Sequence, residues 1–258
     1  MNESPESSTR ADSVRAFAVL AAAVLQIAGG IVGGPGLLGE SVSSVANAYP
    51  TLLQPGGAAF SIWSLIYAAF LILAVRQVLP GQRARVVHRR SGWWLVAAGV
   101  LNATWIVLFT QRSFIPAQVA IVALLVVLAC AANRMRSPGG GWADRLLLRL
   151  PITVYLGWVA IATVAGAGTT LAAVASAPSA WLSVAALVVT AVLVVAAIWW
   201  LPAIAGFVLA VCWAFAWIAV ATTAPEVAAA SLAALAAAAL AGAVRAARSR
   251  QKSTVLFG

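Results

Sequence analysis

The chain has 258 residues, of which 63% are hydrophobic and only 9% are charged. A soluble domain carries about 25% charged residues, so this composition excludes an ordinary soluble domain and indicates a polytopic membrane protein. In such a protein the placement of the net charge of +10 indicates which loops face the cytoplasm. We therefore expect the lipid bilayer as a partner and no binding to nucleic acid.

Eight apolar segments predict an all-α, polytopic integral membrane helical bundle. Each has about 20 residues, which matches a hydrocarbon core of about 30 Å. The prolines fall at segment ends or in loops, as expected for residues that break helices. The least certain boundary is Trp200–Pro202, where one long kinked helix is the alternative to two helices. The predicted helices span residues 14–31, 58–79, 93–110, 115–133, 151–174, 181–200, 202–222 and 225–244.

These helices divide the chain into four regions. Residues 1–13 form a polar tail, residues 14–174 a five-helix membrane domain, residues 175–245 three additional transmembrane helices, and residues 246–258 a basic tail. The loop 33–57 before the second helix is rich in proline and glycine.

The basic residues predict the orientation of the bundle. With the N-terminus inside, fifteen of the sixteen Lys and Arg residues lie in cytoplasmic segments, and only Arg112 lies outside. Basic residues concentrate in cytoplasmic loops of membrane proteins. We therefore expect an integral protein of a bacterial cytoplasmic membrane with both termini in the cytoplasm.

The residue types present argue against catalysis. We expect no ionisable side chain within any span, which argues against a proton pump. His88 lies in a basic loop and is expected to be solvated, and Cys130 and Cys212 read as small apolar residues. Gly139–Gly141 is expected to be a flexible turn. We find no catalytic set of residues and expect no enzyme, no metal and no cofactor.

Three predicted helices carry side chains at the spacing i, i+3, i+7, which places them on one helix face. An aromatic belt at the membrane interface with ordinary core packing is one explanation, and an amide that joins two helices is another. Aromatic walls with one convergent polar group are also typical of a small-molecule pocket. The residues are Phe60, Trp63 and Tyr67; Asn102, Trp105 and Phe109; and Tyr155, Trp158 and Ala162.

The three motifs, in this order and spacing, resemble the TspO/MBR family of tryptophan-rich sensory or translocator proteins over residues 14–174. The resemblance implies a five-helix core that often dimerises, so an oligomer is compatible with it. It also implies a pocket for porphyrins and other hydrophobic aromatic ligands under the loop between the first two helices. The positions that match the pocket are Trp63, Tyr67, Asn102, Trp105, Trp158 and Ala162, and the stripes add Phe60 and Tyr155.

The chain departs from the family at three places. The paired prolines that the family has before the second helix are reduced to Pro55, which is followed by Gly56-Gly57. The proline usual just before Trp63 is replaced by Ser61-Ile62, and the asparagine usual in the fifth helix is replaced by Gly166. The expected function is binding, sensing or translocation of a hydrophobic aromatic ligand such as a tetrapyrrole. The alternatives are an eight-helix small-molecule transporter or permease, and a structural membrane subunit without a ligand.

Overall fold

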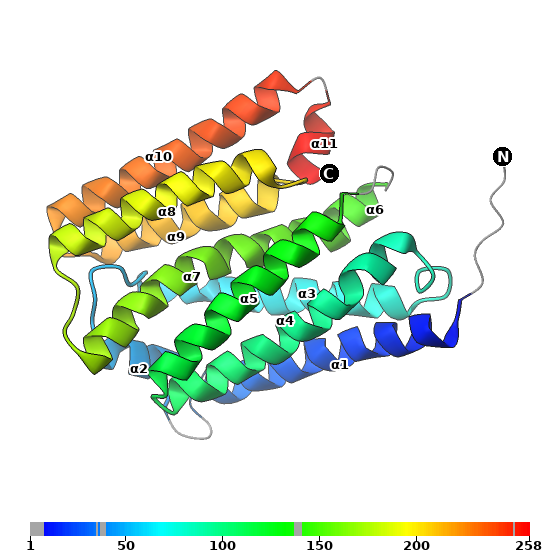
Figure 1. The fold of residues 1–258 in the computed structure, drawn as a ribbon, viewed down its shortest axis with the longest axis horizontal. Coiled ribbons are helices and arrows are strands. Elements are labelled where there is room, and N and C mark those ends of the chain that lie inside the picture. The colour runs from blue at the N-terminus through cyan, green and yellow to red at the C-terminus, as the bar shows by residue number, and fades with distance from the viewer. Residues whose placement is uncertain (1–7, 35, 37–39, 137–140, 250) are drawn as a thin grey trace.

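The computed structural model describes residues 8–34, 36, 40–136, 141–249 and 251–258 (Figure 1). The regular structure of these residues is helical throughout, which confirms the predicted all-α bundle. The long helices are α1 (Arg10–Gly33), α3 (Ile62–Val78), α4 (Val86–Thr110), α5 (Phe114–Arg134), α7 (Leu150–Val174), α8 (Ala180–Trp200), α9 (Ala205–Ala221) and α10 (Pro225–Arg248). The short ones are α2 (Val42–Ala48), η1 (Gly57–Ser61), α6 (Trp142–Asp144), η2 (Arg145–Arg149) and α11 (Lys252–Phe257).

The outer surface of the bundle suits a bilayer. Seven helical segments of the described chain are long and apolar enough to cross a membrane, and α9, with 17 residues, is shorter. A helix of 17 residues is about 26 Å long, close to the thickness of a hydrocarbon core. Large apolar side chains point outward, and Trp181 and Val220 are each 76% exposed. In water such a surface would be unfavourable, whereas lipid chains solvate it.

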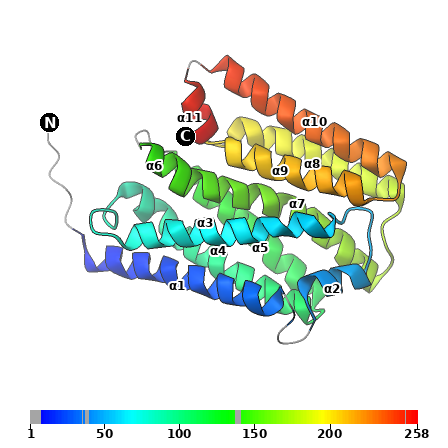
Figure 2. The same ribbon diagram turned by 180° about the vertical axis from the view of Figure 1, so that it is seen from behind.

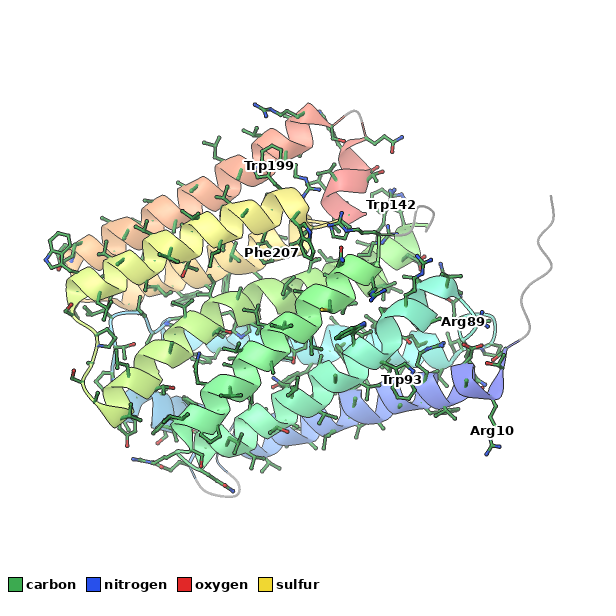
Figure 3. All side chains as sticks on the ribbon, in the orientation of Figure 1. Arg10, Arg89, Trp93, Trp142, Trp199 and Phe207 are labelled. Carbon is green, nitrogen blue, oxygen red and sulfur yellow. The ribbon has the colours of Figure 1, made fainter. Side chains whose placement is uncertain are left out.

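The helices form two groups that pack side by side (Figures 1 and 2). Helices α1, α3, α4, α5 and α7 make one group, and α8, α9 and α10 make the other. Helix α9 lies along α7, and the buried Phe207 of α9 lies in this interface (Figure 3). Two glycines allow the close approach. A Cβ on Gly157 would lie 2.7 Å from the carbonyl oxygen of Phe207, and one on Gly206 would lie 2.6 Å from that of Leu150.

The largest errors among the predicted helix boundaries are the starts of α7 and α4. Helix α7 continues a helical segment that starts at Trp142, so the predicted start at Pro151 is too late. A π-helical turn at Arg145–Arg149 precedes this proline, which lacks an N–H donor and would clash with the fourth carbonyl before it in a regular α-helix. Helix α4 begins at Val86, whereas the prediction began it at residue 93.

The early start of α4 also corrects the prediction for His88. Its side chain is 1% exposed, and neither ring nitrogen has a hydrogen-bond partner among the described residues. The residue belongs to a helix face that includes the buried Ser91 and Leu95, since positions three and four apart share a face. His88 is therefore part of the packed interior of the bundle.

Two acidic side chains organise one end of the bundle, which we call the arginine-rich end. Asp12 binds Arg15 and Arg89, each at 2.7 Å. Asp144 binds Arg76 at 2.6 Å and also pairs with Arg85. A buried carboxylate needs such partners because an unpaired charge is costly to desolvate.

The prediction that no ionisable side chain lies within a span is therefore wrong at the helix ends. Arg15 lies in the second turn of α1, and Arg76 lies in the last turn of α3. Arg112 lies between α4 and α5, at the opposite end of α4 from Arg89.

The remaining predictions concern tails and turns. The polar tail 1–13 is only partly described, since residues 1–7 lie outside the described residues. Its last part is helical, because Thr9 and Asp12 form a capping box at the start of α1. The predicted turn at 139–141 also lies outside the described residues, except for Gly141. Helix α8 ends at Trp200 and α9 begins at Ala205, which confirms two separate helices there.

Candidate functional site

Trp63 of α3 is the centre of an aromatic cluster drawn from α3, α4 and α7. Its ring centroid lies 5.5 Å from Tyr67 and 5.8 Å from Trp105, both in stacked orientations. It lies 5.9 Å from Tyr155 and 6.1 Å from Trp158, both edge to face. These are the distances and angles that aromatic pairs prefer. The three stripes that the sequence indicates thus face one another inside the bundle.

The other residues of the stripes join the same cluster. Phe60, in η1 just before α3, packs edge to face on Trp158 at 5.9 Å. Phe109 stacks on Trp105 at 5.5 Å. Because η1 leads directly into α3, Phe60 lies one turn before Trp63, and both side chains reach toward the same space.

Two hydrogen bonds tie the tyrosines of the cluster to buried amides. The Tyr67 hydroxyl donates to Asn102 Oδ1 at 3.2 Å, and the Tyr155 hydroxyl donates to Gln26 Oε1 at 3.2 Å. Asn102 and Gln26 are each 0% exposed. Gln26 was not predicted as a site residue, although an amide within the apolar segment 14–31 is the same kind of signal as Asn102.

Three buried N–H donors of this region have no partner among the described residues. They are Asn102 Nδ2, Gln26 Nε2 and Trp158 Nε1. A buried donor without a partner costs about 1–3 kcal/mol, so such groups in native proteins meet a water molecule or a ligand. All three can donate, which suits a molecule that carries hydrogen-bond acceptors.

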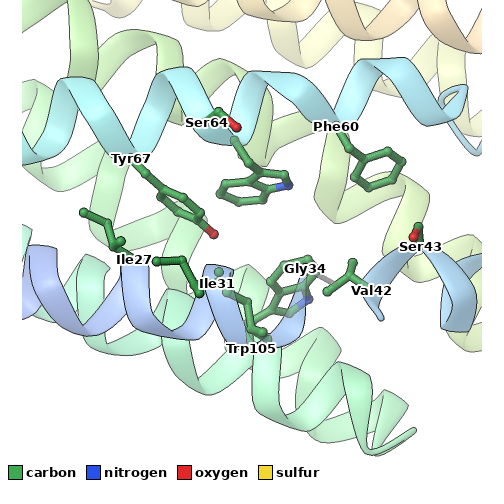
Figure 4. A pocket seen from close by; sticks show the side chains of 12 residues that line it. Ile27, Ile31, Gly34, Val42, Ser43, Phe60, Ser64, Tyr67 and Trp105 are labelled. Carbon is green, nitrogen blue, oxygen red and sulfur yellow. The ribbon is translucent and has the colours of Figure 1, made fainter. Parts of the chain in front are cut away.

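The first chamber is a cavity of about 300 Å³ between α1, α3 and α4. In Figure 4, Tyr67 and Phe60 reach into it from one wall, and Ile31 and Trp105 from the opposite wall. Ile31 and Ser64 at its margin are exposed on the outer surface, so the chamber opens sideways between α1 and α3. The lining residues are Ile27, Gly30, Ile31, Gly34, Val42, Ser43, Phe60, Trp63, Ser64, Tyr67, Trp105 and Ile106.

The second chamber, of about 40 Å³, lies next to the first and shares Val42, Phe60, Trp63 and Trp105 with it. Its wall on the far side of Trp63 comes from α7 and includes Trp158, Ala162 and Gly166. Its cover comes from the connecting segment, which we define as residues 40–61 between α1 and α3. Ala46, Gln54 and Pro55 of this segment line the chamber.

The predicted residues thus divide into two sets. Trp63, Trp105 and Phe60 line both chambers, Tyr67 lines the first, and Trp158 and Ala162 line the second. Asn102 and Tyr155 line neither of these two chambers of the described chain. They lie behind the walls, where Asn102 accepts from Tyr67 and Tyr155 packs on Trp63.

Gly166, which lines the second chamber, leaves space beside α7 for a neighbouring amide. Gln118 of α5 has its Oε1 3.0 Å from the point where a Cβ on Gly166 would lie, and its Nε2 donates to the carbonyl oxygen of Thr163 at 3.1 Å. Gly166 stands out in the sequence as a departure from the family, whereas no sequence signal marks Gln118, because the two residues lie on different helices.

The connecting segment is held at its α2 end by the turn between α4 and α5. Arg112 binds Glu40 with both arms of its guanidinium, at 2.6 and 2.7 Å, and donates to the Tyr49 hydroxyl at 3.1 Å. These hydrogen bonds to Arg112 lower the pKa of the Glu40 carboxyl below its ordinary value. The Tyr49 ring packs on Phe114 at 4.9 Å.

A family model described as TSPO-like protein matches residues 13–246. No curated protein and no solved structure matches the chain. The match includes α8, α9 and α10, so the family extends beyond residues 14–174, where the motifs carry the resemblance. A match over this length, together with the aromatic cluster of α3, α4 and α7, shows that the chain is a membrane protein that belongs to the TSPO-like protein family.

Proposed function

We propose that this protein binds a hydrophobic aromatic ligand, such as a tetrapyrrole, in the two chambers around Trp63. The observation that carries the proposal is the first chamber, a cavity of about 300 Å³ with aromatic walls and few polar groups. Ligand pockets have volumes of about 300–1,000 Å³ and the same apolar lining. The second chamber adjoins it, so a ligand that displaces the Trp63 ring would gain the space of both.

The polar groups around the chambers fit an acceptor-bearing ligand. Trp158 Nε1 is a buried donor in the wall of the second chamber, and Asn102 Nδ2 is another behind Tyr67. A tetrapyrrole with carboxylate groups combines a flat apolar ring with such acceptors. The lining side chains are aromatic, aliphatic, hydroxyl or amide groups, which supports a binding protein over an enzyme.

The sideways opening of the first chamber supports entry from the bilayer. Its margin between α1 and α3 includes Ile31, which is 60% exposed and would face lipid chains. An apolar ligand concentrates in the bilayer, so this route needs no passage through water. We also propose that the arginine-rich end faces the cytoplasm of a bacterial cell, because basic residues concentrate on that side of a membrane.

Titration of the purified protein with protoporphyrin IX tests the proposal, with quenching of tryptophan fluorescence as the readout. We expect saturable binding that weakens in Trp63→Ala and in Trp158→Ala. The matched control is Trp181→Ala, since this tryptophan lies on the outer surface of α8, away from both chambers. Binding that is unchanged in both chamber variants, in protein shown to be folded, would refute the proposed site.

A further inference from the structure

The C-terminal helices touch the connecting segment at the place where it covers the second chamber. Trp213 of α9 donates from its indole Nε1 to the carbonyl oxygen of Ala59 at 3.1 Å. The backbone N–H of Gly56 donates to the carbonyl oxygen of Trp217 at 3.3 Å. Figures 1 and 2 show the segment between α2 and α3 rising to this end of α9.

The contact is close because Gly56 has no side chain. A Cβ at this position would lie 3.0 Å from Cε3 of the Trp217 ring, which is tighter than ordinary van der Waals contact. The rings of Trp213 and Trp217 pack edge to face at 5.6 Å, so the two tryptophans support each other. Together they form one aromatic surface against the segment.

Both contact points are next to residues that line the chambers. Gly56 follows Pro55, which lines the second chamber, and Ala59 precedes Phe60, which lines both. None of the described residues of α9 lines either chamber. Helix α9 therefore makes no direct contact with a ligand in these chambers, and the connecting segment is one route by which it can act on the site.

We propose that Trp213 and Trp217 of α9 form a latch that fixes the cover of the second chamber together with Phe60, which lines both chambers, and thereby sets how fast a ligand that has entered between α1 and α3 reaches and leaves the second chamber. Trp213 is a positioning residue, and the inference rests on the proposed function of the chambers. Gating by a held segment changes association and dissociation together, whereas a lost ligand contact chiefly raises dissociation.

The other contacts that hold the connecting segment lie outside residues 56–59. Arg112 holds its beginning through Glu40 and Tyr49. Thr51 and Leu53 pack on α7 at Gly168, within 3.6 Å of the place where a Cβ would lie. From Gly56 to Ala59, the described hydrogen bonds to other elements are those to α9.

Trp213→Phe tests the latch because it keeps an aromatic ring and removes the N–H donor. In ligand-free protein we expect amide hydrogen exchange in residues 54–61 to become about fivefold faster, the factor for one net hydrogen bond of about 1 kcal/mol. Trp217→Leu, which removes the ring over Gly56, should also make amide hydrogen exchange in residues 54–61 faster. Trp181→Phe, on the outer face of α8, is the matched control and should leave exchange unchanged.

The second readout is stopped-flow binding of protoporphyrin IX, where both rate constants should rise in Trp213→Phe with a smaller change in Kd. Unchanged exchange in both latch variants would overturn the latch. Faster exchange with unchanged ligand kinetics would overturn its role at the site. Absence of binding in the unmodified protein would overturn the proposed function, and the exchange measurement would still decide whether α9 holds the segment.

Discussion

The close crossing of α7 and α9 at Gly206 tests how the two helix groups are joined. Gly206 of α9 faces α7, and a Cβ there would lie 2.5 Å from Thr153 Oγ1, 2.6 Å from the carbonyl oxygen of Leu150 and 2.8 Å from the nitrogen of Val154. Two of these three atoms belong to the backbone, so they cannot rotate away. Gly206→Ala must push α9 from α7.

The change in the free energy of unfolding that Gly206→Ala causes is the sum of two opposing effects. In an open site, replacing glycine by alanine stabilises a helix by about 0.4–1 kcal/mol because the unfolded chain loses freedom. Overpacking of a tight interface costs about 1–3 kcal/mol. The contacts at Gly206 are all under 3.0 Å, so the second effect dominates, and we expect net destabilisation of about 1–2 kcal/mol.

Thermal unfolding in detergent, followed by tryptophan fluorescence, measures this change. A shift of about 2–4 °C per kcal/mol is typical for chains of 150–250 residues. The matched control is Gly57→Ala, because a Cβ at Gly57 meets nothing within 4 Å. This control should leave Tm unchanged or raise it. A Tm for Gly206→Ala equal to or above that of the unmodified protein would refute the steric argument.

Three further predictions concern the site and the topology. Trp63→Ala and Trp158→Ala should each weaken binding of protoporphyrin IX by roughly 1–3 kcal/mol, the scale for one buried apolar side chain, and equal Kd values in the titration would contradict this. Asn102→Ala removes the acceptor of the Tyr67 hydroxyl and should destabilise the protein by about 1–3 kcal/mol. Tm and Kd measured on the same sample separate an effect on packing from an effect on binding, and an unchanged Tm would argue against a stabilising hydrogen bond between Tyr67 and Asn102. In intact cells an impermeant thiol reagent should label Ser44→Cys but not Arg85→Cys, and the reverse pattern would overturn the proposed orientation.

Part of the site could be predicted from the sequence because it depends on helix geometry. Residues at i, i+3 and i+7 share a helix face whatever surrounds the helix, so Trp63 and Tyr67 had to point the same way. The apolar composition required each helix to satisfy its own backbone in lipid, which fixed the all-α class. The cost of a lipid-exposed amide then favoured an inward-facing Asn102, and it is indeed 0% exposed.

The partners of these residues could not be predicted in the same way, because they come from other helices. Gln26 meets Tyr155 across 129 positions of sequence, and Trp213 meets Ala59 across 154. Neither distance leaves a periodic signal in the chain. The burial of His88 likewise depends on the neighbours that pack against the first turn of α4.

Local periodicity and hydropathy therefore predicted the helical class, the approximate spans and which residues of each stripe share a helix face. The walls of the two chambers and the hydrogen bonds of α9 to the segment over one of them depend on contacts between helices that are distant in sequence. The physical reason is that close packing selects partners by shape. The missing side chain of Gly56 admits the Trp217 ring, and only the folded bundle brings the two together.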